Sequence, residues 1–190
     1  MKIGLFFGSF NPIHVGHLII ANSMANHTDL EQVWFVVSPQ NPFKKNNSLL
    51  HEFDRFTMVE RAIAENFKLK ATDIEFNLPK PSYTIDTLVV LAEKYPQHEF
   101  VLIMGEDNLV QFENWKNYQQ ILDYYALYVY PRPNTAPHNF KNHPKVKFVE
   151  APLLDISATF IRKLLQENKS IKYLVTEPVE DYIKIKNFYR

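Results

Sequence analysis

Two histidines with the spacing needed for phosphate chemistry stand near the start of the chain. His14 and His17 lie in FGSFNPIHVGH, residues 7–17, between an apolar run and the sequence LIIA. Imidazoles this close can hydrogen-bond phosphate oxygens and stabilise charge that grows during transfer. Gly8 lets backbone N–H groups approach an anion without a Cβ in the way, and a following helix adds unpaired N–H groups. The stretch therefore predicts a phosphate-binding site; a plain turn, with His14 exposed and His17 capping the helix, is the alternative.

Other kinds of catalytic site find less support in the sequence. The chain has no cysteine, which excludes disulfides and thiol chemistry. The dinucleotide-binding pattern G-x-G-x-x-G and the Walker pattern G-x-x-x-x-G-K-[ST] are both absent. No third ligand stands at a customary spacing from the two histidines, so we predict no protein-bound metal.

The composition of the 190 residues is that of a folded globular protein, with 46% hydrophobic and 14% aromatic residues. Lys plus Arg equals Asp plus Glu at 21 each, so the net charge gives no reason to expect nucleic acid or an acidic membrane as a partner. No stretch reads as a membrane span or a signal peptide. We expect a cytoplasmic protein with one domain over residues 1–190, whose helical C-terminal part covers roughly residues 155–190. A homo-oligomer remains open.

Strand-like and helix-like segments alternate along the chain. Continuous apolar runs of strand length occur at residues 3–7, 33–37, 100–104 and 126–130, with a shorter candidate at 146–149. Helical patterns occur at residues 17–27, 52–65 and 84–94. A further helix is predicted at residues 158–167, with Ser157 as its cap, and a last one from about Pro178. The alternation predicts an α/β, Rossmann-like, three-layer fold with a mostly parallel central sheet and helices on both faces.

The predicted elements place the histidines at a ligand crevice. In such sheets ligands bind beyond the carboxyl ends of the strands, where the strand order reverses, and the first strand ends just before the histidine stretch. The helix at 52–65 is amphipathic, with Phe53, Phe56 and Ile63 on one side and its glutamates and arginines on the other. The proline-rich residues 131–144 predict an irregular surface connection.

Two motifs resemble those of the nucleotidyltransferase superfamily that includes adenylyltransferases. GSFNPIHVGH at residues 8–17 resembles the signature G-[ST]-F-x-P-x-H-x-G-H, and ISATFIR at residues 156–162 resembles the I-S-S-T-x-I-R motif. The resemblance implies that ATP contacts Gly8, Ser9, Phe10, His14, His17, Gly105, Asp107, Ile156, Ser157, Thr159 and Arg162.

Further stretches resemble one family within it, the bacterial nicotinate-nucleotide adenylyltransferases. These are PSYTIDTL at residues 81–88, IMGEDNL at 103–109 with FENW at 112–115, YPRP at 130–133, and the tail from residue 177. The resemblance implies transfer of AMP from ATP to nicotinate mononucleotide, which gives deamido-NAD and pyrophosphate. It also implies that nicotinate mononucleotide contacts Ser82, Tyr83, Thr84, Trp115, Tyr118 and Arg132.

The resemblance assigns roles to individual residues. His14, His17, Lys44 and Arg162 are the catalytic set, in which Arg162 suits a triphosphate because a guanidinium makes paired hydrogen bonds to phosphate oxygens. Trp115 offers a flat face for the pyridine ring. Asp107 corresponds to an acid that positions the ribose or a loop, and Mg²⁺ would arrive with ATP.

The chain departs from the family pattern at Phe7, Asn11 and Phe43. Three alternatives remain open from the sequence: another adenylyl- or cytidylyltransferase that accepts phosphopantetheine, one that accepts nicotinamide mononucleotide, and a nucleotide-binding regulatory module without catalysis.

Overall fold

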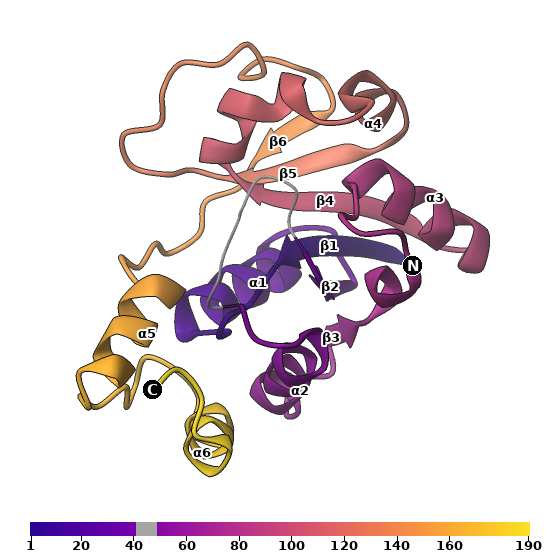
Figure 1. Cartoon of the computed structure of the whole chain (residues 1–190). Coiled ribbons are helices and arrows are strands. Elements are labelled where there is room, and N and C mark those ends of the chain that lie inside the picture. The colour runs from indigo at the N-terminus through magenta and orange to yellow at the C-terminus, as the bar shows by residue number, and fades with distance from the viewer. Residues whose placement is uncertain (41–48) are drawn as a thin grey trace.

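A computed structural model describes residues 1–40 and 49–190 and contains one sheet of six strands (Figure 1). The strands are β1 (Lys2–Gly8), β2 (Gln32–Val37), β3 (Leu69–Thr72), β4 (Glu99–Gly105), β5 (Ala126–Tyr130) and β6 (Val146–Phe148). Their order across the sheet is β3-β2-β1-β4-β5-β6, and every neighbouring pair is parallel. The chain reverses its direction of progress between β1 and β4, which makes the carboxyl ends of these two strands the expected ligand crevice.

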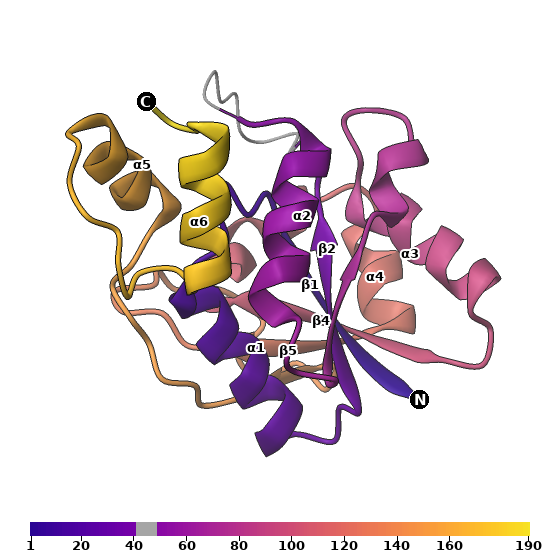
Figure 2. The same ribbon diagram turned by 90° about the horizontal axis from the view of Figure 1, so that it is seen from below.

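Helices cover both faces of the sheet (Figure 2). One side carries α1 (Val15–His27), α2 (Glu52–Ile63) and α6 (Glu177–Lys186), with α5 (Ala158–Gln166) beside α6. The other side carries α3 (Thr84–Lys94) and α4 (Tyr118–Tyr124). Two short 3₁₀ helices, η1 (Ile74–Asn77) and η2 (Glu106–Asn114), follow β3 and β4. The predicted three-layer α/β fold is confirmed, and the sheet is parallel throughout.

The strands are apolar on both faces because each face packs against helices. In β1, Ile3 and Leu5 belong to the core under α3 and η2, whereas Phe6 belongs to the core under α1 and α2. Alternation along a strand sends successive side chains to opposite faces. The continuous apolar runs in the sequence were therefore a correct indication of strands buried on both sides.

The structure adds four elements that the sequence analysis did not predict, namely β3, α4 and the two 3₁₀ helices η1 and η2. Strand β3 lies at the edge of the sheet, where the exposed Lys70 places its ammonium 4.4 Å from the ring centroid of Trp34. An edge strand tolerates such polar positions, so the apolar run that marks a central strand is missing. Helix α1 also begins at Val15, two residues earlier than predicted.

The predicted polar side of α2 is wrong at Arg55. This residue has 0% of its surface exposed, whereas Phe53, expected on the buried side, is 59% exposed. The helix turns Arg55 toward backbone carbonyl groups that need donors, and this requirement outweighs the preference of a cation for water.

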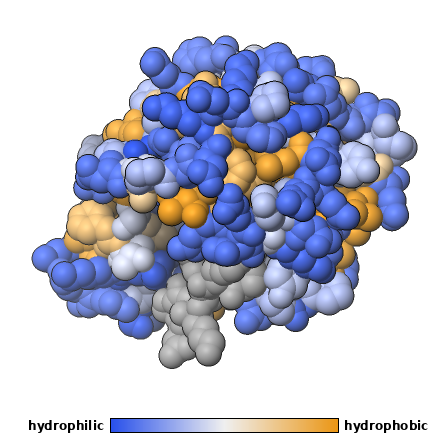
Figure 3. Space-filling view, turned by 90° about the horizontal axis from the view of Figure 1, so that it is seen from above, coloured by the Kyte–Doolittle hydropathy of each residue, from blue (hydrophilic) through white to orange (hydrophobic). Residues whose placement is uncertain are grey.

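Residues 131–144 form an irregular connection, as predicted, although Phe140 is buried within it. Figure 3 shows one face of the molecule that is mainly hydrophilic, with its hydrophobic side chains scattered in small groups. Within residues 1–40 and 49–190, no helix combines the length and the apolar character needed to cross a membrane.

Candidate active site

Two adjoining cavities open at the carboxyl ends of β1 and β4. The larger cavity, of about 740 Å³, contains all the residues predicted to contact ATP except Gly105. The smaller cavity, of about 150 Å³, contains Ser82, Tyr83, Thr84 and Trp115 of the set predicted for nicotinate mononucleotide. The two cavities share lining residues, namely Phe6, Phe7, Gly8, Asn108, Trp115 and Tyr130. One continuous cleft therefore spans both predicted substrate sites.

The histidines of the first motif form a fixed pair at the start of α1. His14 is the N-cap residue, and His17 is the third residue of the helix. The alternative interpretation, in which His17 caps the helix, is therefore wrong. The rings stack with centroids 3.7 Å apart, and the His14 backbone N–H donates to His17 Nδ1 at 3.3 Å. Because Nδ1 accepts this bond, a neutral His17 carries its proton on Nε2, which is then the donor atom of the ring.

His14 is held uncharged. It is 6% exposed, and burial, with a further contribution from the charge of Arg132, lowers the pKa of His14 to about 4. Among the described residues none hydrogen-bonds His14 Nδ1, which is buried. A neutral imidazole in this position can donate one hydrogen bond without bringing a full charge into the cavity.

Two glycines of the motif leave room for neighbouring rings. A Cβ on Gly8 would lie 2.7 Å from the Phe10 ring, and one on Gly16 would lie 3.1 Å from His14 Nδ1. Phe10 itself adopts a positive φ of 45°. The absence of a side chain at Gly8 therefore also leaves room for the Phe10 ring, while Gly8 itself lines the larger cavity, and its contact with a phosphate stays a prediction.

The second motif reaches the first through Arg162. Its Nη1 donates to the Asn11 carbonyl at 2.8 Å and its Nη2 to Thr159 Oγ1 at 3.1 Å. Ser157 caps α5 by accepting a hydrogen bond from the Phe160 amide at 3.1 Å, as predicted. Arg162 thus joins α5 to the histidine loop while it lines the larger cavity.

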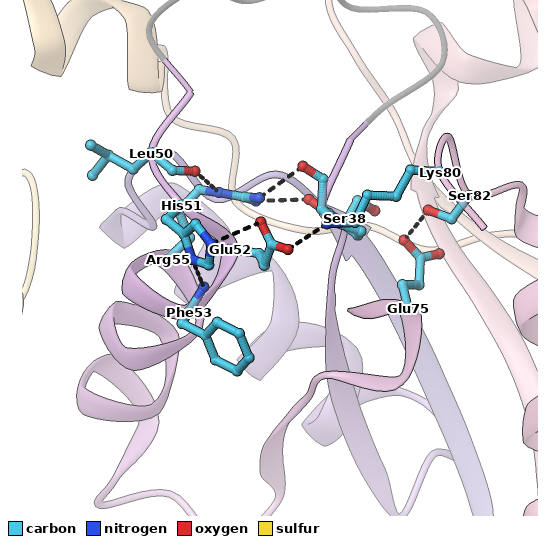
Figure 4. A network of polar contacts seen from close by, with 10 residues as sticks. Ser38, Leu50, His51, Glu52, Phe53, Arg55, Glu75, Lys80 and Ser82 are labelled. Carbon is cyan, nitrogen blue, oxygen red and sulfur yellow. Dashed lines mark hydrogen bonds and ion pairs between the residues drawn. The ribbon is translucent and has the colours of Figure 1, made fainter. Parts of the chain in front are cut away.

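Arg55 is hydrogen-bonded to the same loop through Ser9, and Figure 4 shows its bonds to Leu50 and Ser38. Its guanidinium donates to the carbonyls of Ser9 at 2.5 Å, Ser38 at 2.8 Å, Pro39 at 3.0 Å and Leu50 at 2.9 Å. Burial lowers the pKa of Arg55, although a guanidinium remains charged at neutral pH. One buried cation thereby connects the ends of β1 and β2 to the segment that precedes α2.

Asn11, one of the departures from the family pattern, is a buried junction of four segments. Its Oδ1 accepts hydrogen bonds from the Leu50 amide at 3.3 Å and from the Tyr189 hydroxyl at 2.8 Å. Its backbone carbonyl accepts the bond from Arg162. An amide oxygen satisfies both donors without a charge, which accounts for the tolerance of asparagine here.

The smaller cavity lies between the start of α3 and the end of η2. Helix α3 begins without a side-chain cap, and the amides of Asp86 and Thr87 bond to the Tyr83 carbonyl. The Thr84 amide, by contrast, forms no hydrogen bond with the described part of the chain. Trp115 ends η2 on the opposite wall. An aromatic face and an available helix N-terminus therefore face the same small volume.

An ion pair joins the two walls at the mouth of the smaller cavity. Lys116 Nζ lies 2.8 Å from Asp86 Oδ2 and 4.8 Å from the Tyr83 ring centroid. Both charged side chains are substantially exposed, so the pair contributes little to stability.

Several predicted residues lie elsewhere than expected. Arg132 lines the larger cavity, 3.8 Å from Asp107 Oδ1, instead of the cavity with Trp115 and Thr84. Tyr118 lines neither cavity and packs edge-on against Phe112, with ring centroids 6.0 Å apart. Gly105 lines the smaller cavity.

Two residues named in the sequence analysis fall in the part of the chain that the structure does not describe. Lys44 and Phe43 lie outside the described residues. Within the described ranges, no three His, Asp or Glu side chains gather in a way that could hold a metal ion.

Sequence reasoning missed Arg55, Glu75 and Tyr189 as parts of the site. Arg55 resembles an ordinary exposed helix residue in the sequence, and Tyr189 lies 178 residues from its partner Asn11. Glu75, which is 2% exposed and lines the smaller cavity, is bonded to two hydroxyls farther along the chain. No local pattern identifies such partners.

Comparisons with known proteins agree with this geometry. Residues 5–164 match the cytidylyltransferase-like family. A protein of Cytophaga hutchinsonii named as a probable nicotinate-nucleotide adenylyltransferase is 66% identical over 189 residues, which cover 100% of this chain and 98% of that protein. A protein of the same name from Flavobacterium johnsoniae is 53% identical over 192 residues and the full length of both chains.

Solved structures share the fold. Nicotinic acid mononucleotide adenylyltransferase of Plasmodium falciparum complexed with NaAD has a TM-score of 0.83 and 23% identity, covering 99% of this chain and 97% of that chain. The same enzyme complexed with APC has a TM-score of 0.82 and the same identity, over 99% and 96% of the two chains.

Proposed function

Because the chain belongs to the cytidylyltransferase-like family and, within it, to the nicotinate-nucleotide adenylyltransferases, we propose that it transfers AMP from ATP to nicotinate mononucleotide. A phosphate oxygen of nicotinate mononucleotide attacks the α-phosphorus of ATP. The bond from that phosphorus to the oxygen bridging to the β-phosphate breaks, and pyrophosphate leaves. The product is deamido-NAD, so the reaction belongs to NAD biosynthesis.

The observation that best supports this reaction is the pair of joined cavities at the switch point of the sheet. The larger cavity carries both nucleotidyltransferase motifs, and the smaller one carries an aromatic wall and a helix N-terminus. An enzyme that joins two nucleotides needs both sites within reach of one phosphorus atom.

We assign the chemistry to hydrogen-bond donors that meet growing negative charge. His17 donates through Nε2, His14 contributes a neutral donor, and Arg162 adds a cation that lines the same cavity. Arg132 joins this set, since it lines the same cavity. Fixed donors of this kind stabilise a phosphoryl transition state without a covalent enzyme intermediate.

Mg²⁺ enters this proposal as part of the substrate, MgATP. Magnesium is commonly held by phosphate oxygens and water, so it requires no dedicated cage of protein ligands. Lys44 keeps its predicted role in offsetting phosphate charge. The cytoplasmic location, the absence of nucleic-acid partners and the question of a homo-oligomer stay predictions.

The test is pyrophosphate release from MgATP with each candidate acceptor in turn. We expect release with nicotinate mononucleotide and little with nicotinamide mononucleotide or phosphopantetheine. Release with phosphopantetheine alone would identify another transferase of the superfamily. Binding of ATP without release for any acceptor would identify a regulatory module and overturn the proposal.

A further inference from the structure

Glu75 is a buried carboxylate whose partners are all hydroxyl groups. It lies in η1, and its Oε2 accepts a hydrogen bond from Ser82 Oγ at 2.7 Å while its Oε1 accepts one from Thr87 Oγ1 at 2.7 Å. Figure 4 shows the bond to Ser82. No Lys, Arg or His in the described ranges forms an ion pair with it. Burial raises the pKa of Glu75, against the bonds from Ser82, Thr87 and Ser38, which favour the charged form.

The two hydroxyls stand on either side of one turn. Ser82 precedes Tyr83 and Thr84, whereas Thr87 follows them in the first turn of α3. Through these bonds the carboxylate fixes the turn from both ends. The turn carries the Thr84 amide, which lines the smaller cavity with Glu75 itself. Ser82 is 7% exposed and its hydroxyl is bonded to Glu75, so this hydroxyl holds the turn, while the contact of Ser82 with a substrate stays a prediction.

We propose that Glu75 is a positioning residue that holds the start of α3 so that its amide donors meet the carboxylate of the acceptor's pyridine ring. This proposal rests on the proposed function. A carboxylate needs aligned N–H donors, whereas a neutral carboxamide needs them less, so the turn held by Glu75 sets the preference for the acid over the amide.

Two variants distinguish the hydrogen bonds that Glu75 makes to Ser82 and Thr87 from its negative charge. Glu75→Ala removes both hydrogen bonds. Glu75→Gln keeps one acceptor oxygen and presents an amide to the other hydroxyl. Thr87 can accept that amide because its own hydroxyl lies 3.3 Å from the Tyr83 carbonyl, to which it can donate. The glutamine therefore restores the bridge without the charge.

The experiment measures KM and kcat for both acceptors and for ATP. We expect Glu75→Ala to raise KM for nicotinate mononucleotide about tenfold or more, with KM for ATP within twofold, since the lost alignment affects donors to a charged group. We expect its preference for the acid over the amide, as a ratio of kcat/KM, to shrink about fivefold or more, and Glu75→Gln to stay within about threefold of wild type.

A matched control is Glu52→Gln. Glu52 pairs with Lys80 on the same connection, at 2.5 Å, but lies on α2 outside both cavities. This variant should keep the wild-type KM and kcat for both acceptors and for ATP. If Glu75→Ala does not unfold cooperatively, Thr87→Val takes its place, with a rise in KM for the acid of about threefold to tenfold.

The outcomes distinguish the two proposals. With an active wild type, any of three results overturns the role of Glu75 alone. These are an unchanged KM for nicotinate mononucleotide in Glu75→Ala, an equal rise in its KM for ATP, and a Glu75→Gln variant as impaired as Glu75→Ala. A wild type that releases no pyrophosphate with nicotinate mononucleotide overturns the proposed function and this inference with it.

Discussion

The two cavities of the cleft are supported by buried charges of opposite sign. The guanidinium of Arg55 bonds to four backbone carbonyls, among them that of Ser9, which lines the larger cavity. Beside the smaller cavity, the carboxylate of Glu75 bonds to two side-chain hydroxyls. Both side chains have almost no exposed surface. Among the described residues neither group forms an ion pair, and hydrogen bonds compensate each charge, as burial of a charge requires.

The difference follows from what each half has to present. Near the larger cavity, backbone carbonyls at the ends of β1 and β2 need a donor, and Arg55 supplies it. A helix start that offers N–H groups to a carboxylate needs its preceding turn held by an acceptor such as Glu75. The comparison teaches that each supporting charge is opposite in sign to the atoms that face it. Arg55 faces carbonyl oxygens, and Glu75 faces hydroxyl hydrogens, although both proposed substrates are anionic.

The largest effect expected from this comparison concerns Arg55. Arg55→Met removes the shared donor and leaves four buried carbonyls to find other partners, so we expect the free energy of unfolding to fall by about 3–5 kcal/mol. Urea unfolding measures it. Arg61→Met, on the same helix and stacked 4.5 Å from the Tyr182 ring centroid, is the control and should cost about 1 kcal/mol or less. Equal losses in both variants would show that Arg55 does not support the larger cavity.

His17→Ala tests the chemistry of the larger cavity. Loss of one aligned transition-state donor lowers kcat by roughly 100- to 1000-fold, and KM for nicotinate mononucleotide should change little. Pyrophosphate release measures both constants. His27→Ala, at the far end of α1, should retain wild-type rates. A near-wild-type kcat in His17→Ala would remove His17 from the mechanism.

The uncharged state of His14 predicts a dependence of stability on pH. Its pKa falls from 6.5 to about 4 on folding, so between these values the unfolded chain binds a proton that the folded chain does not. The free energy of unfolding therefore falls as pH drops through this window, by roughly 3 kcal/mol from this residue. His14→Gln should lose less stability than wild type over the same range in urea unfolding. Parallel profiles would contradict a neutral, buried His14.

Trp115 gives the smallest effect and sharpens the division between the cavities. Stacking on an aromatic side chain contributes about 1–3 kcal/mol, so Trp115→Ala should raise KM for nicotinate mononucleotide roughly tenfold, with a smaller change for ATP because Trp115 also borders the larger cavity. Steady-state kinetics measures both. Trp34→Phe, in β2 and outside both cavities, serves as the control. An equal rise for both substrates would mean that Trp115 does not discriminate between them.

Much of the fold could be predicted because it depends on local patterns. Apolar runs marked the central strands, and the predicted helix at residues 84–94 has the observed bounds of α3. The edge strand β3 and the short helix α4 escaped because neither has the repeated apolar pattern of a longer, more buried element.

The sequence by itself determined the layers of the fold and the residues of the two phosphate motifs, since both are written in short stretches with fixed spacing. Tertiary structure alone decided that Asn11 joins Leu50, Tyr189 and Arg162, that Arg132 lines the same cavity as His14, and that Arg55 and Glu75 are buried. The physical reason is that a buried polar group must find partners wherever the fold brings them, often from distant parts of the chain, and no local spacing encodes that choice.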